Sequence, residues 1–299
     1  MFSELAAIVR PEAIKYDQLM SEYTTFKIGG PIDVLVEPVD TEQLRQVLLW
    51  CRSKDVPFLV FGAASNLLVR DKGIRGVGIR IADRFSKYMI EGNVIFAQAG
   101  ILLANLARIA ADHELTGIEF AEGIPGTLGG AVVMNAGAYD HEMREILLEA
   151  DAVSSDGEII SFKPEDMDMG YRHSIFQKNG MTVVSARLSL NRSKNELIRA
   201  RMQELADSRA SKQPLDKPSA GSVFRRPEGY YVGPMVEKLG LKGYRIGGAK
   251  VSKKHAGFIV NTGKATAADV IALIEEIQRR AREEYGVELQ TEIRIVGEE

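Results

Sequence analysis

Apolar and polar residues follow two periods along this chain, which predicts a mixed α and β structure. Residues 40–52 place apolar side chains at i, i+3, i+4 and i+7, the spacing of an amphipathic helix whose buried face ends at Cys51. Asp40 and Gln43 provide the cap at its start. We expect Cys51 to be a small buried hydrophobe, with a reactive thiol as the alternative.

The same reasoning assigns most of the chain. Helices are expected over 101–113, 194–209, 233–239 and 266–285, and the last has a capping pair at Thr266 and Asp269 and a stop at Gly286. A buried strand is expected over 56–61, further strands over 181–190 and 255–261, and hairpins over 87–100 and 148–163. The polar, proline-containing stretch 211–224 is expected to be a domain junction or a functional loop.

The closing stretch ELQTEIRIV, residues 288–296, alternates polar and apolar side chains. Period two places four of its polar residues on one face of a strand, namely Glu288, Gln290, Glu292 and Arg294. A plain solvent-facing strand side explains this pattern on composition alone. Chemistry at Glu292 therefore needs a separate argument.

The most distinctive stretch is AEGIPGTLGGAVVMNAGAY, residues 121–139. Its five glycines lie among small apolar residues, and each costs about 0.5–1 kcal/mol in a packed helix or strand relative to alanine. Such a run lets backbone N–H groups approach a flat or anionic ligand without side chains in the way. A connection that only turns the chain is the alternative. A second small-residue loop, FGAASNLLV at 61–69, favours a large phosphate-bearing cofactor.

Composition describes an ordinary globular protein of 299 residues, 45% hydrophobic and 26% charged, with a net charge of −3. No concentrated lysine and arginine face is visible in the sequence, so nucleic acid is not expected as a partner. The N-terminus lacks the pattern of a signal peptide, and no run of about 18 apolar residues is present to span a membrane. We expect a cytoplasmic protein, monomeric or weakly homo-oligomeric, without membrane contact.

Common nucleotide and catalytic motifs are absent. The sequence contains no GxxxxGK[ST] phosphate loop, no strand–GxGxxG–helix fingerprint and no GxSxG elbow. Its single cysteine and four histidines show no metal-ligand spacing, so no metal site is expected. A nucleotide cofactor must therefore be held by a fold other than the usual dinucleotide-binding one.

Three polar residues remain as candidates for chemistry. Arg172 lies within YRHSIF (171–176), Ser222 follows a glycine in AGSVFRRP (220–227), and Glu292 lies in the closing stretch. Each has a structural alternative. Arg172 suits a surface salt bridge, Ser222 a turn hydroxyl bonded to its own backbone, and Glu292 a solvent-facing strand position. The residue types alone leave these alternatives open.

With these motifs the chain resembles the UDP-N-acetylenolpyruvoylglucosamine reductases of bacterial cell-wall synthesis (the MurB family), from about residue 20 to the C-terminus. Seven motifs carry the resemblance: YTTFKIGGP (23–31), FGAASNLLV, GIEFAEGIPGTLGGAVVMNAGAY (117–139), YRHSIF, AGSVFRRP, LKGYRIGGAKVSKKHAGFIVN (241–261) and TEIRIVG. The absence of a long insertion after Tyr171 and the intact KHAGFIVN resemble the shorter type II branch of the family.

The resemblance implies an α+β fold, in which a two-subdomain FAD-binding unit of the vanillyl-alcohol-oxidase (PCMH) type is followed by an α/β substrate-binding domain. The expected boundaries are 1–80 for the first FAD-binding subdomain, with the strand 291–299 returning to it, 81–192 for the second subdomain and 193–290 for the substrate-binding domain.

The resemblance also assigns residues to the site. Noncovalent FAD is expected to contact two loops and the residues that follow them: Gly62, Ala63, Ala64, Ser65, Asn66, Leu67, Gly123, Ile124, Pro125, Gly126, Gly129, Gly130, Asn135 and Ala136. The catalytic residues are expected to be Arg172, Ser222 and Glu292. The substrate is expected to contact Tyr139, Lys212, Arg225, Arg226 and His255.

The implied reaction uses NADPH to reduce FAD, after which the enolpyruvyl ether of the UDP-sugar enters the same cleft. Hydride adds to the terminal alkene carbon, and the charge that develops toward the carboxylate must be met by fixed donors. Arg172 meets it by charge and Glu292 by a hydrogen bond when protonated. Ser222, a weak acid that needs cationic neighbours, delivers the proton to the other carbon. The product is UDP-N-acetylmuramate, a peptidoglycan precursor on which cell shape and division depend.

Two features depart from the family pattern. Ala63 and Ala64 stand where glycine is common, and an alanine at positive φ costs about 1 kcal/mol or more, so a lower but not abolished FAD affinity is expected. Arg226 replaces an asparagine that many relatives have, which puts any substrate hydrogen bond of that asparagine in doubt.

Two other functions remain as alternatives. Another FAD-dependent oxidoreductase or oxidase of the same fold commonly tethers its flavin through histidine or cysteine, but no histidine lies in either small-residue loop. A binding module without chemistry conflicts with the presence of all three catalytic motifs. The absorption spectrum of the purified protein, bleached by NADPH and restored by the enolpyruvyl sugar, separates these alternatives.

Overall fold

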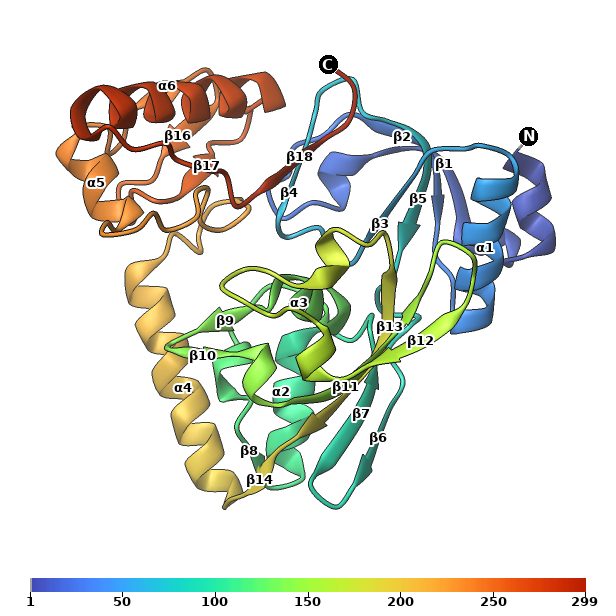
Figure 1. Cartoon of the computed structure of the whole chain (residues 1–299). Coiled ribbons are helices and arrows are strands. Elements are labelled where there is room, and N and C mark those ends of the chain that lie inside the picture. The colour runs from blue at the N-terminus through green and yellow to red at the C-terminus, as the bar shows by residue number, and fades with distance from the viewer. Residues whose placement is uncertain (1) are drawn as a thin grey trace. The chain divides into compact units, whose positions relative to one another are not determined.

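The computed structural model describes residues 2–299, in which helices and strands are mixed along the whole chain (Figure 1). The chain forms two compact units. The first contains the residues up to Tyr16, Val34–Ala63 and Gly76–Arg209, and the second contains Asp17–Asp33, Ala64–Arg75 and Ala210–Glu299. Each unit is therefore assembled from separate stretches of sequence.

The first unit contains a five-stranded antiparallel sheet in the order β12-β11-β13-β7-β6. Its strands are β6 (Tyr88–Glu91), β7 (Val94–Gln98), β11 (Leu147–Val153), β12 (Ile159–Phe162) and β13 (Thr182–Ser189). Both predicted hairpins are confirmed, because β6 pairs with β7 and β11 with β12. Ile95 and Ala97 of β7 are fully buried while Phe96 between them is not, so one face of this strand packs into the core.

The first unit also contains α1 (Thr41–Ser53), α2 (Leu103–Asp112), α3 (Leu128–Met134) and all but the end of α4 (Asn195–Lys212). The predicted cap of α1 is confirmed, since the Gln43 N–H donates to the Asp40 carboxylate at 2.8 Å. Cys51 is fully buried on α1, and burial raises the pKa of its thiol to about 11. The thiol therefore stays protonated at neutral pH and packs as a small hydrophobe.

A four-stranded sheet has the order β1-β2-β5-β3, with β3 and β5 parallel. Its strands are β1 (Ile14–Leu19), β2 (Pro31–Val36), β3 (Phe58–Phe61) and β5 (Ile74–Arg80). The prediction of a buried strand over 56–61 is wrong in part, because β3 is an edge strand. Phe58 is 44% exposed there, and only Phe61 is buried. An edge strand lacks a neighbour on one side, so its side chains need not be fully enclosed.

Short elements complete the chain. Paired two-residue strands are β8 (Leu115–Thr116) with β14 (Asn191–Arg192), and β9 (Gly137–Ala138) with β10 (His141–Glu142). Short 3₁₀ helices cover Phe2–Ala7, Pro11–Ala13, Met20–Glu22, Glu119–Ala121, Met143–Glu145, Pro164–Asp166 and Ile175–Gln177.

The second unit is built around α6 (Ala267–Tyr285), α5 (Val232–Lys238) and a three-stranded sheet of β15 (Arg245–Ile246), β16 (Ala249–Val251) and β17 (Ile259–Asn261). The predicted α6 is confirmed at both ends. Thr266 and Asp269 form a capping box, and Gly286 takes the left-handed conformation at φ 65°. In the same unit β4 (Leu67–Val69) pairs in parallel with β18 (Arg294–Val296).

Three predicted segments differ from the structure. The strand predicted over 255–261 is only β17, because the residues before it turn, with the Phe258 N–H donating to the His255 carbonyl. The strand predicted over 288–296 is only β18, so Glu288, Gln290, Glu292 and Arg294 do not share a strand face. The glycine run 121–139 is not helix-free, since Leu128–Met134 forms α3.

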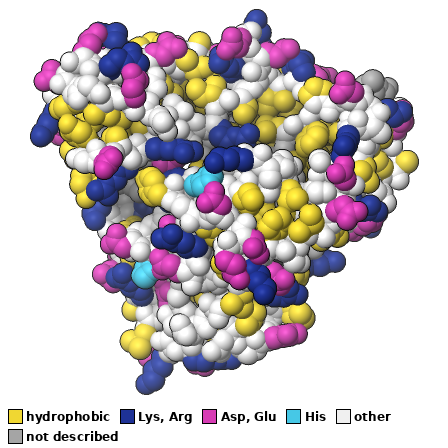
Figure 2. Space-filling model, in the orientation of Figure 1, with side chains coloured by type: hydrophobic (Ala, Val, Ile, Leu, Met, Phe, Trp, Pro, Cys, Tyr) yellow, Lys and Arg dark blue, Asp and Glu magenta, His cyan; other side chains and the backbone are white. Residues whose placement is uncertain are grey.

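Within the described residues, none of the helices has the length and apolar character needed to cross a lipid bilayer. Figure 2 shows acidic and basic side chains interspersed over the visible face, with hydrophobic side chains between them.

Candidate active site

The first small-residue loop carries backbone N–H groups that are available to an anion. Across residues 2–299, no protein acceptor is present for the N–H groups of Gly62, Ala63, Ala64 and Ser65. Ala64 takes the left-handed conformation at φ 49°, and a left-handed residue in a turn directs neighbouring N–H groups into an anion-binding concavity. The strain expected of an alanine at positive φ therefore falls on Ala64, at about 1 kcal/mol. This loop fits the phosphates of a dinucleotide.

The second loop, 123–130, offers fewer amides than its glycine content suggests. The N–H groups of Gly126, Leu128 and Gly129 donate to backbone carbonyls at 2.8–2.9 Å. Glycine instead permits close packing: a Cβ on Gly129 would lie 2.8 Å from the Cβ of Ala99. The backbone of this loop is therefore largely engaged with the protein itself.

The two loops meet at Gly62. A Cβ on Gly62 would lie 2.2 Å from Oγ1 of Thr127, far inside van der Waals contact. Thr127 is 2% exposed and is the N-cap of α3, so it has little freedom to withdraw. Glycine at position 62 is thus what allows the first loop to lie against the second.

Arg209, near the end of α4, is a candidate site residue that sequence reasoning misses. A Cβ on Gly123 would lie 2.7 Å from Cδ of Arg209 and 3.3 Å from its Nη1, so this glycine makes room for the arginine. The buried Nε of Arg209 has no hydrogen-bond partner within residues 2–299. In the sequence Arg209 is one of several arginines on a polar helix, and only the structure distinguishes it.

The charge around Arg209 points to an anion. Burial lowers the pKa of its guanidinium, and the charge of Arg172 lowers that pKa further, whereas Tyr139 raises it. No carboxylate is among these described neighbours. A buried cation beside a second cation, with an unmet hydrogen-bond donor, is stabilised when an anion binds between them.

Tyr139 fixes the helix face that carries Arg209. Its hydroxyl donates to the Leu205 carbonyl of α4 at 2.7 Å. Leu205 and Arg209 are four residues apart and so share a face of the helix. Tyr139 itself has φ 56°, a conformation that non-glycine residues adopt at a cost and that clusters at functional sites. The residue predicted to contact substrate therefore also positions α4.

Arg172 is held in a similarly strained turn. Its φ is 53°, and one guanidinium nitrogen donates to the Gly137 carbonyl at 3.0 Å. The turn is closed by the antiparallel bridge between Gly170 and His173. The guanidinium also lies 5.2 Å from the centre of the Tyr171 ring. These contacts aim the side chain and keep it half-buried, which is the setting expected of a residue that meets substrate charge.

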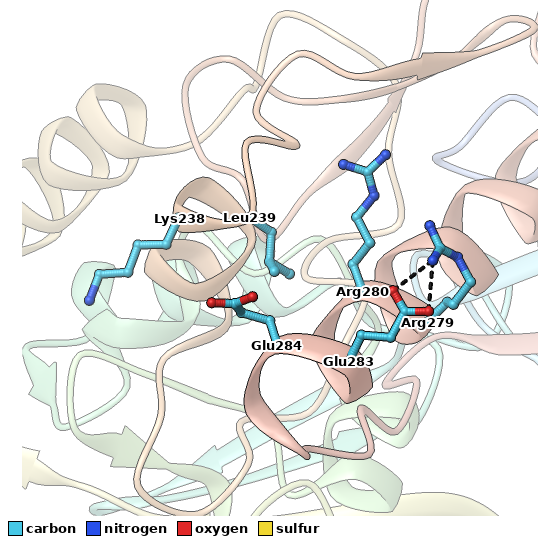
Figure 3. A pocket seen from close by; sticks show the side chains of 6 residues that line it. All are labelled: Lys238, Leu239, Arg279, Arg280, Glu283 and Glu284. Atoms are coloured by element: carbon cyan, nitrogen blue, oxygen red, sulfur yellow. Dashed lines mark hydrogen bonds and ion pairs between the residues drawn. The ribbon is translucent and has the colours of Figure 1, made fainter.

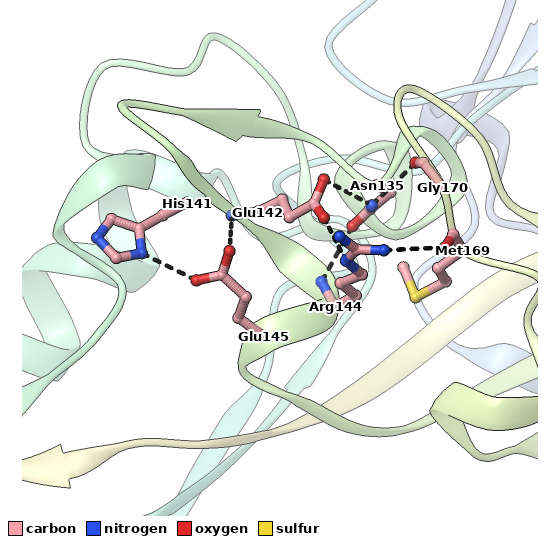
Figure 4. Close-up of polar contacts among 7 residues, drawn as sticks. All are labelled: Asn135, His141, Glu142, Arg144, Glu145, Met169 and Gly170. Atoms are coloured by element: carbon pink, nitrogen blue, oxygen red, sulfur yellow. Dashed lines mark hydrogen bonds and ion pairs between the residues drawn. The ribbon is translucent and has the colours of Figure 1, made fainter.

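Asn135 supports this turn from inside the protein (Figure 4). It is fully buried at the left-handed end of α3. Its amide donates to Glu142 at 3.0 Å and to the Gly170 carbonyl at 2.9 Å, and it accepts from the Arg144 N–H at 3.0 Å. The structure thus gives the Asn135 side chain a positioning role, acting through Gly170 on the turn that carries Arg172.

In the second unit, the backbone of Val223 links the segment that carries Ser222 to Glu292. Ser222 forms an antiparallel bridge with Phe258, and the Val223 N–H donates to the Gly257 carbonyl at 3.0 Å. On its other side the Val223 carbonyl accepts from the Glu292 N–H at 2.8 Å. These bonds hold the backbone segments of both catalytic candidates next to each other.

Asn66, a predicted cofactor residue, is joined to the same region. Its amide donates to the Glu292 carbonyl at 3.1 Å, and its own carbonyl accepts from the Arg294 N–H at 2.9 Å. The N–H and the carbonyl of Glu292 both form hydrogen bonds, so its backbone position is fixed. Its side chain is half-buried.

The predicted substrate residues of the second unit differ in their surroundings. Arg225 has a buried Nε without a hydrogen-bond partner within residues 2–299, and so does the Oε1 of Gln213, a residue that sequence reasoning misses. Arg226 lies over the exposed Tyr231, 3.8 Å from the ring centre, in a cation–π contact. Lys212 is the last residue of α4. His255 is half-buried beside Gly257.

A hollow of about 360 Å³ between α5 and α6 contains none of the predicted site residues (Figure 3). It is lined by Lys238, Leu239, Arg279, Arg280, Glu283 and Glu284. Arg279 is paired with Glu283 at 2.7 Å and with Glu276 at 2.9 Å, so much of its charge is already balanced. We assign this hollow no role in catalysis.

Two family models match the chain. One, described as UDP-N-acetylenolpyruvoylglucosamine reductase, C-terminal domain, matches residues 213–296, and one described as FAD binding domain matches residues 32–163. The first contains Ser222 and Glu292, and the second contains both small-residue loops.

Known proteins match over the full length. A UDP-N-acetylenolpyruvoylglucosamine reductase of Syntrophomonas wolfei is 54% identical over 299 residues, which is 100% of both chains. A solved UDP-N-acetylenolpyruvylglucosamine reductase of Thermus caldophilus matches with a TM-score of 0.81 and 37% identity, over 93% of this chain and 97% of that one. Alkyldihydroxyacetonephosphate synthase, at 15% identity and a TM-score of 0.50 over 64% of this chain and 40% of that one, shares the fold alone.

Proposed function

Because the chain belongs to the UDP-N-acetylenolpyruvoylglucosamine reductase family, we propose that Arg172, Ser222 and Glu292 carry its chemistry. The activity is the FAD-dependent reduction of UDP-N-acetylenolpyruvoylglucosamine with NADPH as reductant, a step of peptidoglycan synthesis. The predicted family, fold class and cofactor are confirmed. The domain boundaries and the roles of individual residues stay predictions.

The observation that supports the catalytic assignment is the backbone bond from the Glu292 N–H to the carbonyl of Val223, the residue that follows Ser222. Bound FAD supplies the hydride chemistry. In our proposal Ser222 delivers a proton to the carbon that does not receive hydride, and Glu292 donates a hydrogen bond to the charge that develops on the carboxylate. Arg172 meets the same charge with its guanidinium. Arg225, whose buried Nε is unbonded within residues 2–299, supplies the cationic surroundings that a serine acid needs.

For the cofactor, we propose that the free amides of the first loop and the guanidinium of Arg209 hold the phosphates. The amides of the second loop are mostly engaged, so the positive charge on that side must come from a side chain. Arg209 lies beside Gly123, and its Nε–H has no hydrogen-bond acceptor within residues 2–299. This assigns Gly123 the task of making space for Arg209.

Arg209→Gln tests that assignment. A hydrogen bond to a charged group is worth about 1.5–3 kcal/mol, so the dissociation constant of FAD is expected to rise by about 10–100-fold. Flavin fluorescence titration of the apoprotein measures it. Arg201→Gln is the matched control, because Arg201 lies on the same helix but is exposed and paired with Glu204. Unchanged FAD affinity in Arg209→Gln would remove Arg209 from the cofactor site.

Gly62→Ala tests the contact between the loops. The added Cβ would overlap Thr127 Oγ1 and force the first loop away, so we expect protein purified without flavin but with native circular dichroism. Gly92→Asn is the control, since Gly92 lies outside both loops, a Cβ there would have nothing within 4 Å, and asparagine tolerates its left-handed φ of 60°. A yellow Gly62→Ala protein with full flavin occupancy contradicts the role of this loop contact.

We further propose a cytoplasmic location, supported by the chemistry of the reaction, because NADPH and UDP-activated sugars are cytoplasmic compounds. The monomeric or weakly homo-oligomeric state stays a prediction, and sedimentation of the holoenzyme tests it.

A further inference from the structure

His255 lies in a tight cage within the second unit. A Cβ on Gly233 of α5 would lie 3.2 Å from Cε1 of His255, and a Cβ on Gly257 would lie 3.0 Å from the same atom. The Phe258 ring completes the cage, with ring centres 5.1 Å apart in an edge-to-face arrangement. Two glycines and an aromatic ring therefore fix the orientation of the imidazole.

One imidazole nitrogen is used as an acceptor. The Gly257 N–H donates to Nδ1 of His255 at 3.1 Å. A nitrogen that accepts carries no proton, so the neutral ring is held in the tautomer with its proton on Nε2. The backbone N–H of Gly257 is thereby held by the ring.

Gly257 is the first link in a chain of bonds to both catalytic candidates, since its N–H is bonded to the ring and its carbonyl to the next segment. The Gly257 carbonyl accepts from the Val223 N–H at 3.0 Å, and the Val223 carbonyl accepts from the Glu292 N–H at 2.8 Å. Ser222 precedes Val223, and a Cβ on Gly257 would lie only 3.4 Å from its hydroxyl oxygen. Each link is a backbone bond that sets the position of the next segment.

We propose that His255 is a positioning residue, which holds Ser222 and Glu292 in register through Gly257 and Val223 and requires an unprotonated Nδ1 to do so. This inference rests on the catalytic roles proposed for Ser222 and Glu292. It gives His255 a task different from direct contact with substrate.

The surroundings keep the imidazole neutral. Burial lowers the pKa of His255, and the charge of Lys242 lowers it further. The residues packed against the ring, Gly233, Gly257 and Phe258, carry no charge, and Lys242 is the charged group that acts on it. Protonation at low pH would turn Nδ1 into a donor and break its bond with the Gly257 N–H. The positioning is therefore complete above the unfolded-state pKa of about 6.5 and is lost as pH falls through the lower folded-state pKa.

Three variants of the holoenzyme test the proposal: His255→Asn, His255→Ala and, as control, the exposed His141→Asn. An asparagine oxygen can replace Nδ1 as an acceptor, whereas alanine cannot. The readouts are flavin reoxidation by the enolpyruvyl substrate between pH 5 and 8, flavin reduction by NADPH, and the imidazole pKa from NMR. Because small misplacement of catalytic groups is costly, His255→Ala is expected to slow limiting reoxidation by about 10–100-fold.

The expected pattern is specific to positioning. In wild type and His141→Asn, the reoxidation rate falls at the pH where NMR shows His255 titrating. His255→Asn retains most of the neutral-pH rate, and its rate no longer falls at that pH. Wild-type reoxidation in His255→Ala, or equal losses in the alanine and asparagine variants, would overturn the proposal. A raised KM with an unchanged limiting rate would assign His255 to substrate contact instead. Wild-type reoxidation in Ser222→Ala would show separately that the catalytic assignment beneath the inference had failed.

Discussion

Ser222→Ala is expected to slow reoxidation of the flavin by the enolpyruvyl substrate by about 10²–10⁴-fold, the usual cost of losing a positioned proton donor. The reduction of the flavin by NADPH should be nearly unchanged, because no proton from Ser222 is needed before hydride reaches the substrate carbon. Stopped-flow absorbance of the flavin measures the two half-reactions separately.

The structure makes this variant conservative. Ser222 is held by its backbone, through the bridge with Phe258 and the neighbouring bond from the Val223 N–H, and alanine retains both. Ser86→Ala is the control, since the Ser86 hydroxyl makes a solvent-exposed bond with the nearby Asp83 carbonyl. Equal slowing of both half-reactions in Ser222→Ala contradicts a role as acid and indicates a structural one.

The elements that sequence predicts correctly are those whose causes are local. The caps of α1 and α6 need only residues three positions apart, and the stripe of apolar residues on each helix needs only a regular period. The hairpins β6–β7 and β11–β12 need a tight turn between two short runs. Each of these signals is complete within about 20 residues, so it can be read without knowing the rest of the fold.

The elements that sequence predicts wrongly depend on distant partners. The alternation over 288–296 is real, but Gln290 and Thr291 pair only with residues 224–225, so no continuous strand forms before Arg294. Whether β3 is buried depends on its position at the edge of a sheet. The helix α3 forms despite two glycines because Gly129 packs directly against Ala99, a contact that no local pattern reveals.

The site residues likewise divide into those that the sequence reveals and those that only the structure reveals. Arg172, Ser222 and Glu292 are accessible from the sequence because whole motifs of a known family surround them. Arg209 is not, because its significance comes from an unbonded Nε and from Gly123, a residue far away in sequence. Asn135 is predicted as a cofactor residue, yet its hydrogen bonds to Glu142, Gly170 and Arg144 are visible only in the structure. Residue type and motif suggest which residues belong to a site, whereas contacts decide what each one does.

Glu292→Ala is expected to reduce substrate-driven flavin reoxidation by about 10²–10³-fold, which corresponds to roughly 3–4 kcal/mol for one lost donor to a developing oxyanion. Glu292→Gln should be intermediate, because its amide can donate part of the same bond. Thermal stability should change little, since the Glu292 backbone keeps its bonds with Val223 and Asn66.

Glu288→Ala is the control that separates catalysis from surface polarity. Glu288 is exposed and bonded to Arg282 at 2.8 Å, and this partner lowers the pKa of its carboxyl group. An exposed pair of this kind contributes little to stability because solvent screens it, so its loss should leave reoxidation unchanged. The two glutamates lie four residues apart in one polar stretch, yet only Glu292 is bonded through its backbone to the segment that carries Ser222. If both alanine variants reoxidise at the same rate, the polar pattern of the stretch is sufficient to explain Glu292 and its catalytic assignment is wrong.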